Sequence, residues 1–246
     1  MNTRRKFLLN GSMATTALFI ANPIKTFSNT IAQVTGFSDS NNKLVLVHTG
    51  NYKSSKLNQT IKHIAEIKRK QGNVVLLHAG NGVESNTANL NHDASMKNHN
   101  NFSFTSGNYS ILHKGKIKIG IVNTTEGDHG TIHKTNVLAA YLKKEKNCHI
   151  VVCLSQLGYK TKNNLDDITL AAKSAHLDII IGGHEKNNSP RPVVAYNINK
   201  QEVLINHSAG NHLAFGKIEI DFDELGKKKQ ISFRNPVPRS PLEIPG

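Results

Sequence analysis

The stretch that decides the fold is Asp178-Ile-Ile-Ile-Gly-Gly-His-Glu-Lys186. Three consecutive isoleucines leave no polar face, which is typical of a central β-strand covered on both sides. Gly182 and Gly183 then allow a sharp turn of the backbone where a side chain would clash. The strand is therefore expected to deliver His184 and Lys186 to a crevice at its carboxyl end. The alternative is a Gly-Gly turn followed by a surface histidine.

Before this stretch, segments with the pattern of strands alternate with segments that have the pattern of helices. A strand, a helix and a second strand in succession predict a parallel pair joined by a right-handed crossover. The polar segment 86–108 is expected to be a loop. The predicted strands are 43–48, 73–77, 109–112, 117–123 and 149–155. The predicted helices are one that Ser54 and Ser55 can cap and that ends at Gly72, a segment with Val137, Leu138, Tyr141 and Leu142 on one face, and 165–175.

After this stretch, the pattern changes to consecutive strands. These are predicted at 193–198, 202–207, 215–222 and 230–233, and the third of them alternates cleanly between apolar and polar residues. The order of elements predicts an α/β fold in which two sheets pack together and are flanked by helices. Neither a repeat nor a composition change divides residues 40–235.

The first residues have the pattern of an export signal. Arg4-Arg5 is followed by apolar residues and then by an uncharged run over 11–21, which is too short to span a bilayer comfortably. We therefore expect a twin-arginine (Tat) export signal at 1–32, a linker at 33–42, one domain at 43–235 and a proline-rich tail at 236–246. Export of this kind predicts a periplasmic or secreted protein without a transmembrane span in the mature chain.

The composition is basic, with a formal net charge of +14. Removal of residues 1–32 would take away four basic residues and no acid, which leaves +10. A field of this sign favours anionic ligands or surfaces. The lysines are scattered along the sequence without an arginine-rich, aromatic-interleaved patch, so specific nucleic-acid binding is not expected. Lys227–Lys229 are predicted to form a solvated turn.

Polar side chains follow four of the predicted strands. The carboxyl ends of parallel strands gather at one edge of a sheet, so these side chains are predicted to share one crevice. They are Asn51 and Lys53, Asn81, Gln156, and His184 with Lys186.

These segments resemble the motifs of a known family, the calcineurin-like metallophosphoesterases, and in particular the amino-terminal catalytic domain of bacterial 5′-nucleotidases. The resemblance covers roughly residues 43–224. Residues 44–53 (LVLVHTGNYK) are similar to the family's L-H-T-N-D-x-H, 76–81 (LLHAGN) to L-D-A-G-D, 93–99 to D-A-x-x-x-G-N-H-E, 154–159 (LSQLGY) to L-S-H-L-G-Y, and 181–184 (IGGH) to I-G-G-H-x-H.

The resemblance implies a four-layer αββα sandwich of two mixed sheets. It also implies the family's chemistry, which is phosphoester hydrolysis in nucleotide catabolism by two divalent metal ions such as Mn, Zn, Ca or Mg. The positions aligned with metal ligands are Asn51, Asn81, Asn98, Gln156 and His184, and the position aligned with the catalytic histidine is His99.

Most of these positions carry a residue that ligates poorly. Neutral amides replace carboxylates and a histidine, and a protonated lysine cannot ligate. We therefore expect neither a tight binuclear metal centre nor another cofactor. We interpret the chain as a degenerate member of the family, or pseudoenzyme. The alternative is an active hydrolase with a rebuilt mononuclear site, in which His78 and Asp128-His129 join His99 and His184.

Two lysines stand where the family has metal-binding histidines, namely Lys53 and Lys186. Together with the uncharged amides they would leave a positively charged crevice, which predicts binding of phosphate or a nucleotide without metal. The alternative is that both lysines point to water. The family's second domain, which grips the base, would begin where the tail lies, so a separate partner chain is a further hypothesis.

Overall fold

We describe a computed structural model of the chain. The described residues are 42–50, 57–80, 109–125, 127, 130–161, 165–184, 191–207 and 215–234. All of them belong to the second of two units into which the chain divides, Phe37–Gly246. The predicted export signal, nearly all of the linker, the asparagine-rich segment 86–108 and the proline-rich tail lie outside the described residues.

The described strands form two sheets. The four-stranded sheet has the order β10 (Lys228–Arg234), β9 (Gly216–Phe222), β1 (Lys43–Thr49) and β2 (Val74–His78). The six-stranded sheet has the order β3 (Tyr109–Lys114), β4 (Ile117–Thr124), β5 (Ile150–Ser155), β6 (Ile179–Gly182), β8 (Glu202–His207) and β7 (Val193–Tyr196). Both sheets contain parallel and antiparallel pairs, which confirms the predicted α/β fold with two mixed sheets.

The main core lies between the two sheets. Leu44 and Leu46 of β1 belong to the same buried cluster as Ile179 and Ile181 of β6. Ile180 points the other way, into the cluster that packs against α6 (Asp167–Lys173). The central strand is therefore buried on both faces, as its run of isoleucines predicts.

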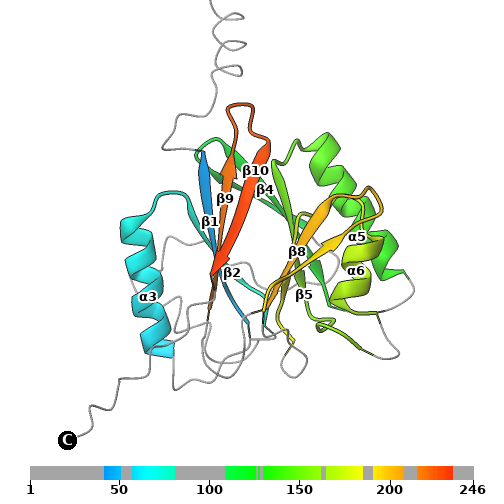
Figure 1. Cartoon of the computed structure of the whole chain (residues 1–246), viewed down its shortest axis with the longest axis horizontal. Helices are drawn as coiled ribbons and strands as arrows, with labels where there is room; N and C mark the ends of the chain where they lie inside the picture. The colour runs from blue at the N-terminus through cyan, green and yellow to red at the C-terminus, as the bar shows by residue number, and fades with distance from the viewer. Residues whose placement is uncertain are drawn as a thin grey trace, which may run out of the picture. The chain divides into compact units, whose positions relative to one another are not determined.

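Helices cover the outer face of each sheet (Figure 1). Helix α3 (Leu57–Lys70) packs against the four-stranded sheet through Ile64, which is fully buried. Helix α5 (Thr131–Ala140), the following π-helical turn η3 (Tyr141–Glu145) and α6 pack against the six-stranded sheet. This succession of helix, sheet, sheet and helix is the predicted four-layer arrangement.

The predicted buried face of the second helix is wrong in part. Val137 is 53% exposed, and the buried positions of α5 are Thr131, Thr135 and Ala139. Leu142 of the predicted face is fully buried and Leu138 packs against the core cluster, so the buried stripe runs through these two residues and Ala139 and leaves Val137 on the solvent side.

The third predicted helix is shorter than 165–175. Helix α6 begins after Asp166, whose side chain accepts a 2.7 Å hydrogen bond from the backbone N–H of Thr169. This is a standard amino-terminal cap. The solvated turn predicted at Lys227–Lys229 is also partly wrong, because Lys228 begins β10.

The two sheets are aligned so that like ends of their parallel strands meet. At one end, the side chain of Gln156, after β5, contacts the carbonyl of Ala79, after β2. At the other end, Lys228 of β10 lies 3.1 Å from Asp178, just before β6. We call the first end the carboxyl edge and the second the amino edge.

Candidate functional site

The carboxyl edge joins the ends of four strands through backbone and amide hydrogen bonds. The N–H of Ala79 donates to the carbonyl of Thr49 at 2.8 Å, which connects β2 to β1. The N–H of Gly183 donates to the carbonyl of Ser155 at 2.8 Å, which connects β6 to β5. The Nε2 atom of Gln156 donates to the carbonyl of Ala79 and connects the two sheets.

Gly183 lies at the closest approach of the two sheets. A Cβ atom added there would lie 1.5 Å from the carbonyl oxygen of Ala79 and 2.7 Å from Nε2 of Gln156. Among the described residues, the glycines with positive φ are Gly115, Gly158 and Gly226. The predicted clash of a side chain at the double glycine is confirmed, and at Gly183 it arises from the close approach of the facing backbone and not from a left-handed conformation.

Gly182 makes room for a side chain of a neighbouring strand. A Cβ atom at this position would lie 2.4 Å from the imidazole of His207, which pairs with Gly182 in the register of β6 and β8. His184 comes two residues after Gly182 and is half-buried at the carboxyl edge.

The structure describes two of the predicted residues of the family-aligned and anion sites, and also His78 of the alternative mononuclear site. Gln156 is nearly buried between the sheets, and His184 lies after β6 on the same edge. The other predicted site residues lie outside the described part of the chain. They are Asn51, Lys53, Asn81, Asn98, His99 and Lys186.

His48 of β1 is a fully buried histidine on the inner face of the four-stranded sheet. Among the described residues, neither of its ring nitrogens has a hydrogen-bond partner. Burial, with a smaller contribution from His207, lowers the pKa of His48 to about 3. The imidazole is therefore neutral at pH 7.

His78 ends β2 and is tied to the neighbouring strand. Its Nδ1 atom lies 2.8 Å from Oγ1 of Thr49, and burial lowers the pKa of the imidazole. Both His48 and His78 thus lie near strand ends at the carboxyl edge.

A buried polar cluster that was not predicted from the sequence lies behind this edge. The hydroxyl of Ser155 donates to Oδ1 of Asp167, and Nε2 of His207 lies 3.1 Å from Oδ2 of the same carboxylate. All three residues are completely buried. The serine donates to the carboxylate and not to the imidazole, so the cluster lacks the nucleophile–base contact of a hydrolytic triad.

This cluster fastens β5, α6 and β8 to one another directly behind Gly182. The ring of Tyr159 meets His207 edge-on at 5.9 Å and closes the cluster. The rule that selected His184, a histidine at the carboxyl end of a predicted strand, also selects His207 at the end of 202–207. The partner Asp167 has no comparable signal, because it comes from a helix.

The residues present do not fit the family's pair of divalent ions. Gln156 points an N–H donor at a backbone carbonyl, whereas the family has a histidine at this position. Of the other aligned positions, Asn51, Lys53, Asn81 and Lys186 supply amides and lysines in place of carboxylates and imidazoles. Asn98, His99 and His184 keep the family's residue types. The described residues contain no group of three or more His, Cys, Asp or Glu side chains that could hold a metal ion.

The fold and the arrangement of its edges define a class, the two-sheet α/β sandwiches of the metallophosphatase type. The chain is similar to the 5′-nucleotidase precursor of Thermus thermophilus, with a TM-score of 0.57, 18% identity, and coverage of 78% of this chain and 54% of that one. It is also similar to the NAD nucleotidase of Haemophilus influenzae, with a TM-score of 0.58, 15% identity, and coverage of 77% and 49%. The chain therefore has the metallophosphoesterase fold, in the form of a nucleotidase amino-terminal domain.

The likeness has two limits. The chain spans about half of the length of these two nucleotidases. No protein-family model matches the chain, and neither does any curated protein sequence.

The described residues include no helix long and apolar enough to cross a bilayer.

Proposed function

We propose that the chain is a catalytically impaired, exported relative of the 5′-nucleotidases that binds phosphate or a nucleotide at the carboxyl edge. One described residue carries the proposal of impairment. The family's fourth motif supplies a histidine to the metals, and here Gln156 occupies that position with its amide N–H directed at the carbonyl of Ala79. An N–H donor cannot give a lone pair to a metal ion.

The hydrogen bond of Gln156 also gives this side chain a structural role. It joins the two sheets at the place where Gly183 packs closest against Ala79. The position that supplies a metal ligand in the family would here join the two sheets. This exchange of roles favours a scaffold that keeps the fold while it lacks the metal centre.

Binding of an anion is the activity that the remaining residues support. Lys53 and Lys186 follow β1 and β6 in the sequence, and both strands end at the carboxyl edge. Lysines are point-charge ligands for phosphate and need no metal. Nucleotides are the proposed ligand class because the two similar solved structures are nucleotidases.

The organisation of the whole chain is part of the same proposal. The leader at 1–32 would direct the protein through the twin-arginine pathway to the periplasm or the exterior, followed by a linker at 33–42, the domain at 43–235 and the tail at 236–246. A separate chain would supply the base-gripping second domain. Protein sequencing of the exported form would test the leader, and a start at residue 1 would exclude its removal.

Metal content and turnover of the purified protein test impairment. We expect sub-stoichiometric metal after dialysis against Mn, Zn or Ca, and no hydrolysis of a nucleotide or an aryl phosphate. Stoichiometric metal, with turnover that is lost in His184→Ala, would refute impairment and favour the active hydrolase with a rebuilt site.

Titration calorimetry with inorganic phosphate and with AMP, in the absence of metal, tests anion binding. Each charge-assisted contact contributes about 1.5–3 kcal/mol, so Lys53→Ala/Lys186→Ala should weaken binding by at least about 100-fold. The matched control is Lys62→Ala/Lys134→Ala, which removes the same charge from α3 and α5. Equal affinity in both double variants would show that the two site lysines do not bind the anion.

A further inference from the structure

The lysines that are scattered along the sequence gather at the amino edge, opposite the candidate site. Three turns and one helix end meet there: β3–β4, β7–β8, β9–β10 and the end of η3. We use the name basic rim for the exposed lysines of these segments, which are Lys116, Lys144, Lys200, Lys227 and Lys229.

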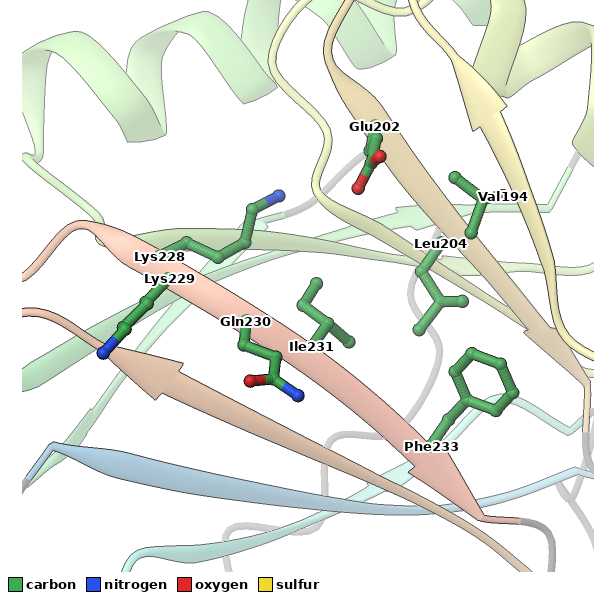
Figure 2. A pocket seen from close by; sticks show the side chains of 8 residues that line it. All are labelled: Val194, Glu202, Leu204, Lys228, Lys229, Gln230, Ile231 and Phe233. Atoms are coloured by element: carbon green, nitrogen blue, oxygen red, sulfur yellow. The ribbon is translucent and has the colours of Figure 1, made fainter.

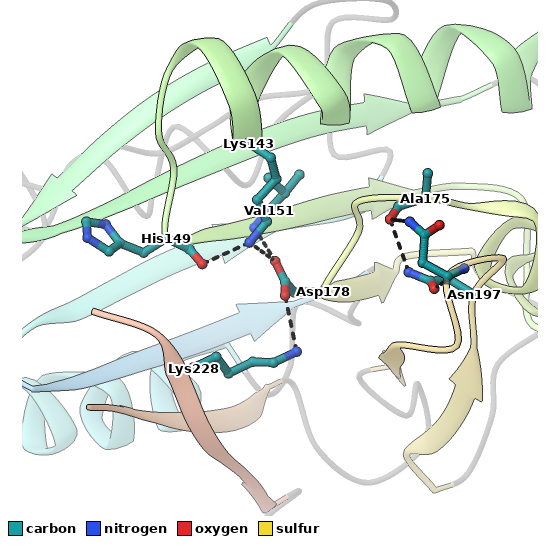
Figure 3. A network of polar contacts seen from close by, with 8 residues as sticks. Lys143, His149, Val151, Ala175, Asp178, Asn197 and Lys228 are labelled. Atoms are coloured by element: carbon teal, nitrogen blue, oxygen red, sulfur yellow. Dashed lines mark hydrogen bonds and ion pairs between the residues drawn. The ribbon is translucent and has the colours of Figure 1, made fainter. Parts of the chain in front are cut away.

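The segments of the basic rim are neighbours in space, as three contacts show. Asp178 accepts from Nζ of Lys143 at 2.7 Å and from Nζ of Lys228 at 3.1 Å, which joins the end of η3 to the start of β10 (Figure 3). The N–H of His149 donates to the carbonyl of Lys118 at 2.8 Å, which joins the start of β4 to the start of β5.

The third contact is a groove that connects β10 with the β7–β8 hairpin. It has a volume of about 270 Å³, with Leu204 and Ile231 among its apolar lining and Lys229 and Glu202 among its polar lining (Figure 2). These contacts place the end of η3, the start of β10 and the β7–β8 hairpin next to one another at the amino edge.

Aliphatic side chains project from two of these turns. Leu225, at the tip of the β9–β10 turn, is 91% exposed, and Ile198, at the tip of the β7–β8 turn, is 60% exposed. Tyr196, at the end of β7, is 61% exposed. Each of these side chains alone is an ordinary surface feature, but on turns that also carry lysines they supply apolar contacts beside positive charge.

Both turns are held rigidly by side chains that bind their own backbone. The carboxylate of Asp223 accepts from the N–H groups of Leu225 at 3.0 Å and of Lys227 at 2.8 Å. The amide oxygen of Asn197 accepts from the N–H groups of Asn199 at 2.9 Å and Gln201 at 3.0 Å. The exposed leucine and isoleucine are thus presented in a fixed position before any partner binds.

We propose that the amino edge docks on an anionic lipid bilayer, with the basic rim on the headgroups and Leu225 and Ile198 at the boundary with the acyl chains. Lysines next to an anionic leaflet and short apolar anchors are the two elements of peripheral membrane binding. The same segments carry four carboxylates, Glu145, Glu202, Asp223 and Glu224, which the five lysines of the basic rim outnumber.

Nucleic acid fits this surface less well than a bilayer does. Sequence-independent nucleic-acid binding combines basic side chains with aromatic rings on which bases stack. Tyr196 offers one exposed ring, but the turn tips carry aliphatic side chains, which gain nothing from phosphates or base edges and gain from contact with lipid. Docking in this way leaves the carboxyl edge facing away from the bilayer. The distance between the two edges is the length of the strands, about 20 Å for β1.

Sedimentation of the full chain with vesicles tests the proposal. The vesicles are phosphatidylcholine alone or an equal mixture of phosphatidylcholine and phosphatidylglycerol, in 0.1 M salt. We expect binding to the mixed vesicles that weakens as salt is raised. Each lysine near an anionic surface contributes about 1 kcal/mol, so Lys227→Gln/Lys229→Gln should lower the partition coefficient roughly 30-fold.

Two further variants separate a bilayer from other polyanions. Leu225→Ser should lower the partition coefficient roughly tenfold, because it removes an apolar anchor without changing the charge. The control Lys62→Gln/Lys134→Gln loses the same charge on the helices and should bind as the unmodified chain does. All variants carry the same residues 1–42, so any contribution of the leader cancels.

The proposal is wrong if the basic-rim variant and the helix control bind the mixed vesicles equally. It is also wrong if Leu225→Ser has no effect while the basic-rim variant loses binding to double-stranded DNA, which would indicate a general polyanion surface. Thermal unfolding monitored by circular dichroism confirms that each variant is folded before its binding is compared.

Discussion

Replacement of Gly183 by alanine should destabilise the protein more than the same replacement at Gly72 or Gly182. The new Cβ atom would lie 1.5 Å from the carbonyl oxygen and 2.2 Å from the carbonyl carbon of Ala79. Both are backbone atoms held by the hydrogen bond from Ala79 to Thr49, so neither can move as a flexible side chain could. The sheets would have to separate at the carboxyl edge.

The magnitude follows from two contributions. Overpacking of a well-packed interior costs about 1–3 kcal/mol, and a contact this short with backbone belongs at the upper end. Separation of the sheets would also break the hydrogen bond from Gln156 to Ala79, whose net contribution is about 1 kcal/mol. We expect Gly183→Ala to lower the free energy of unfolding by about 4 kcal/mol, which corresponds to a fall in Tm of roughly 8–16 °C for a domain of this size.

Urea denaturation followed by circular dichroism at 222 nm measures this loss, since the chain has no tryptophan for fluorescence. Gly72→Ala is the matched control, because a Cβ atom there meets nothing within 4 Å. Its free energy of unfolding should change by less than about 1 kcal/mol. Equal midpoints for the two variants would refute the close approach of the sheets at Gly183.

Two predictions concern pH. His48 has a pKa of about 3 when folded and an ordinary value when unfolded, so the unfolded chain binds the extra proton and stability falls as pH falls from 6.5 towards 3. His48→Leu should therefore become more stable than the unmodified protein by about 2 kcal/mol at pH 5, and an unchanged difference between pH 7 and pH 5 in urea titrations would contradict this. Glu219 is held by Lys217 and Lys43, which lower its pKa to about 2, so its contribution is present above pH 4.5 and is lost as pH falls towards 2. Glu219→Gln should be less stable at pH 7 by about 1 kcal/mol and indistinguishable near pH 2.5, as measured by thermal unfolding; a difference that persists at low pH would exclude this ion pair as the cause.

The local pattern of the sequence was sufficient to predict most of the strands. Runs such as 43–48 and 178–181 are buried on both faces in the structure, and the alternation in 215–222 matches the inward and outward residues of β9. Such patterns record how each segment is buried, which is a property of the segment itself. The four-layer arrangement followed from the order of these elements and from the family resemblance.

Pairing between distant segments was not readable from these patterns. Strand β8 inserts parallel to β6, while the next strand, β9, crosses to the other sheet and pairs antiparallel to β1. Consecutive strands in the sequence allow both arrangements. The choice depends on how the whole core closes, and no short segment contains that information.

For the candidate site, the sequence by itself determined which residue types stand at the family's positions, and therefore that amides and lysines replace metal ligands. The tertiary structure alone decided what the described residues do. It directed the amide of Gln156 to Ala79, made Gly183 necessary through close approach, and brought Asp167 to His207. It also collected scattered lysines at the amino edge, because the ends of strands far apart in the sequence meet there. Residue chemistry is local, whereas contacts and surface charge depend on which distant segments the fold brings together.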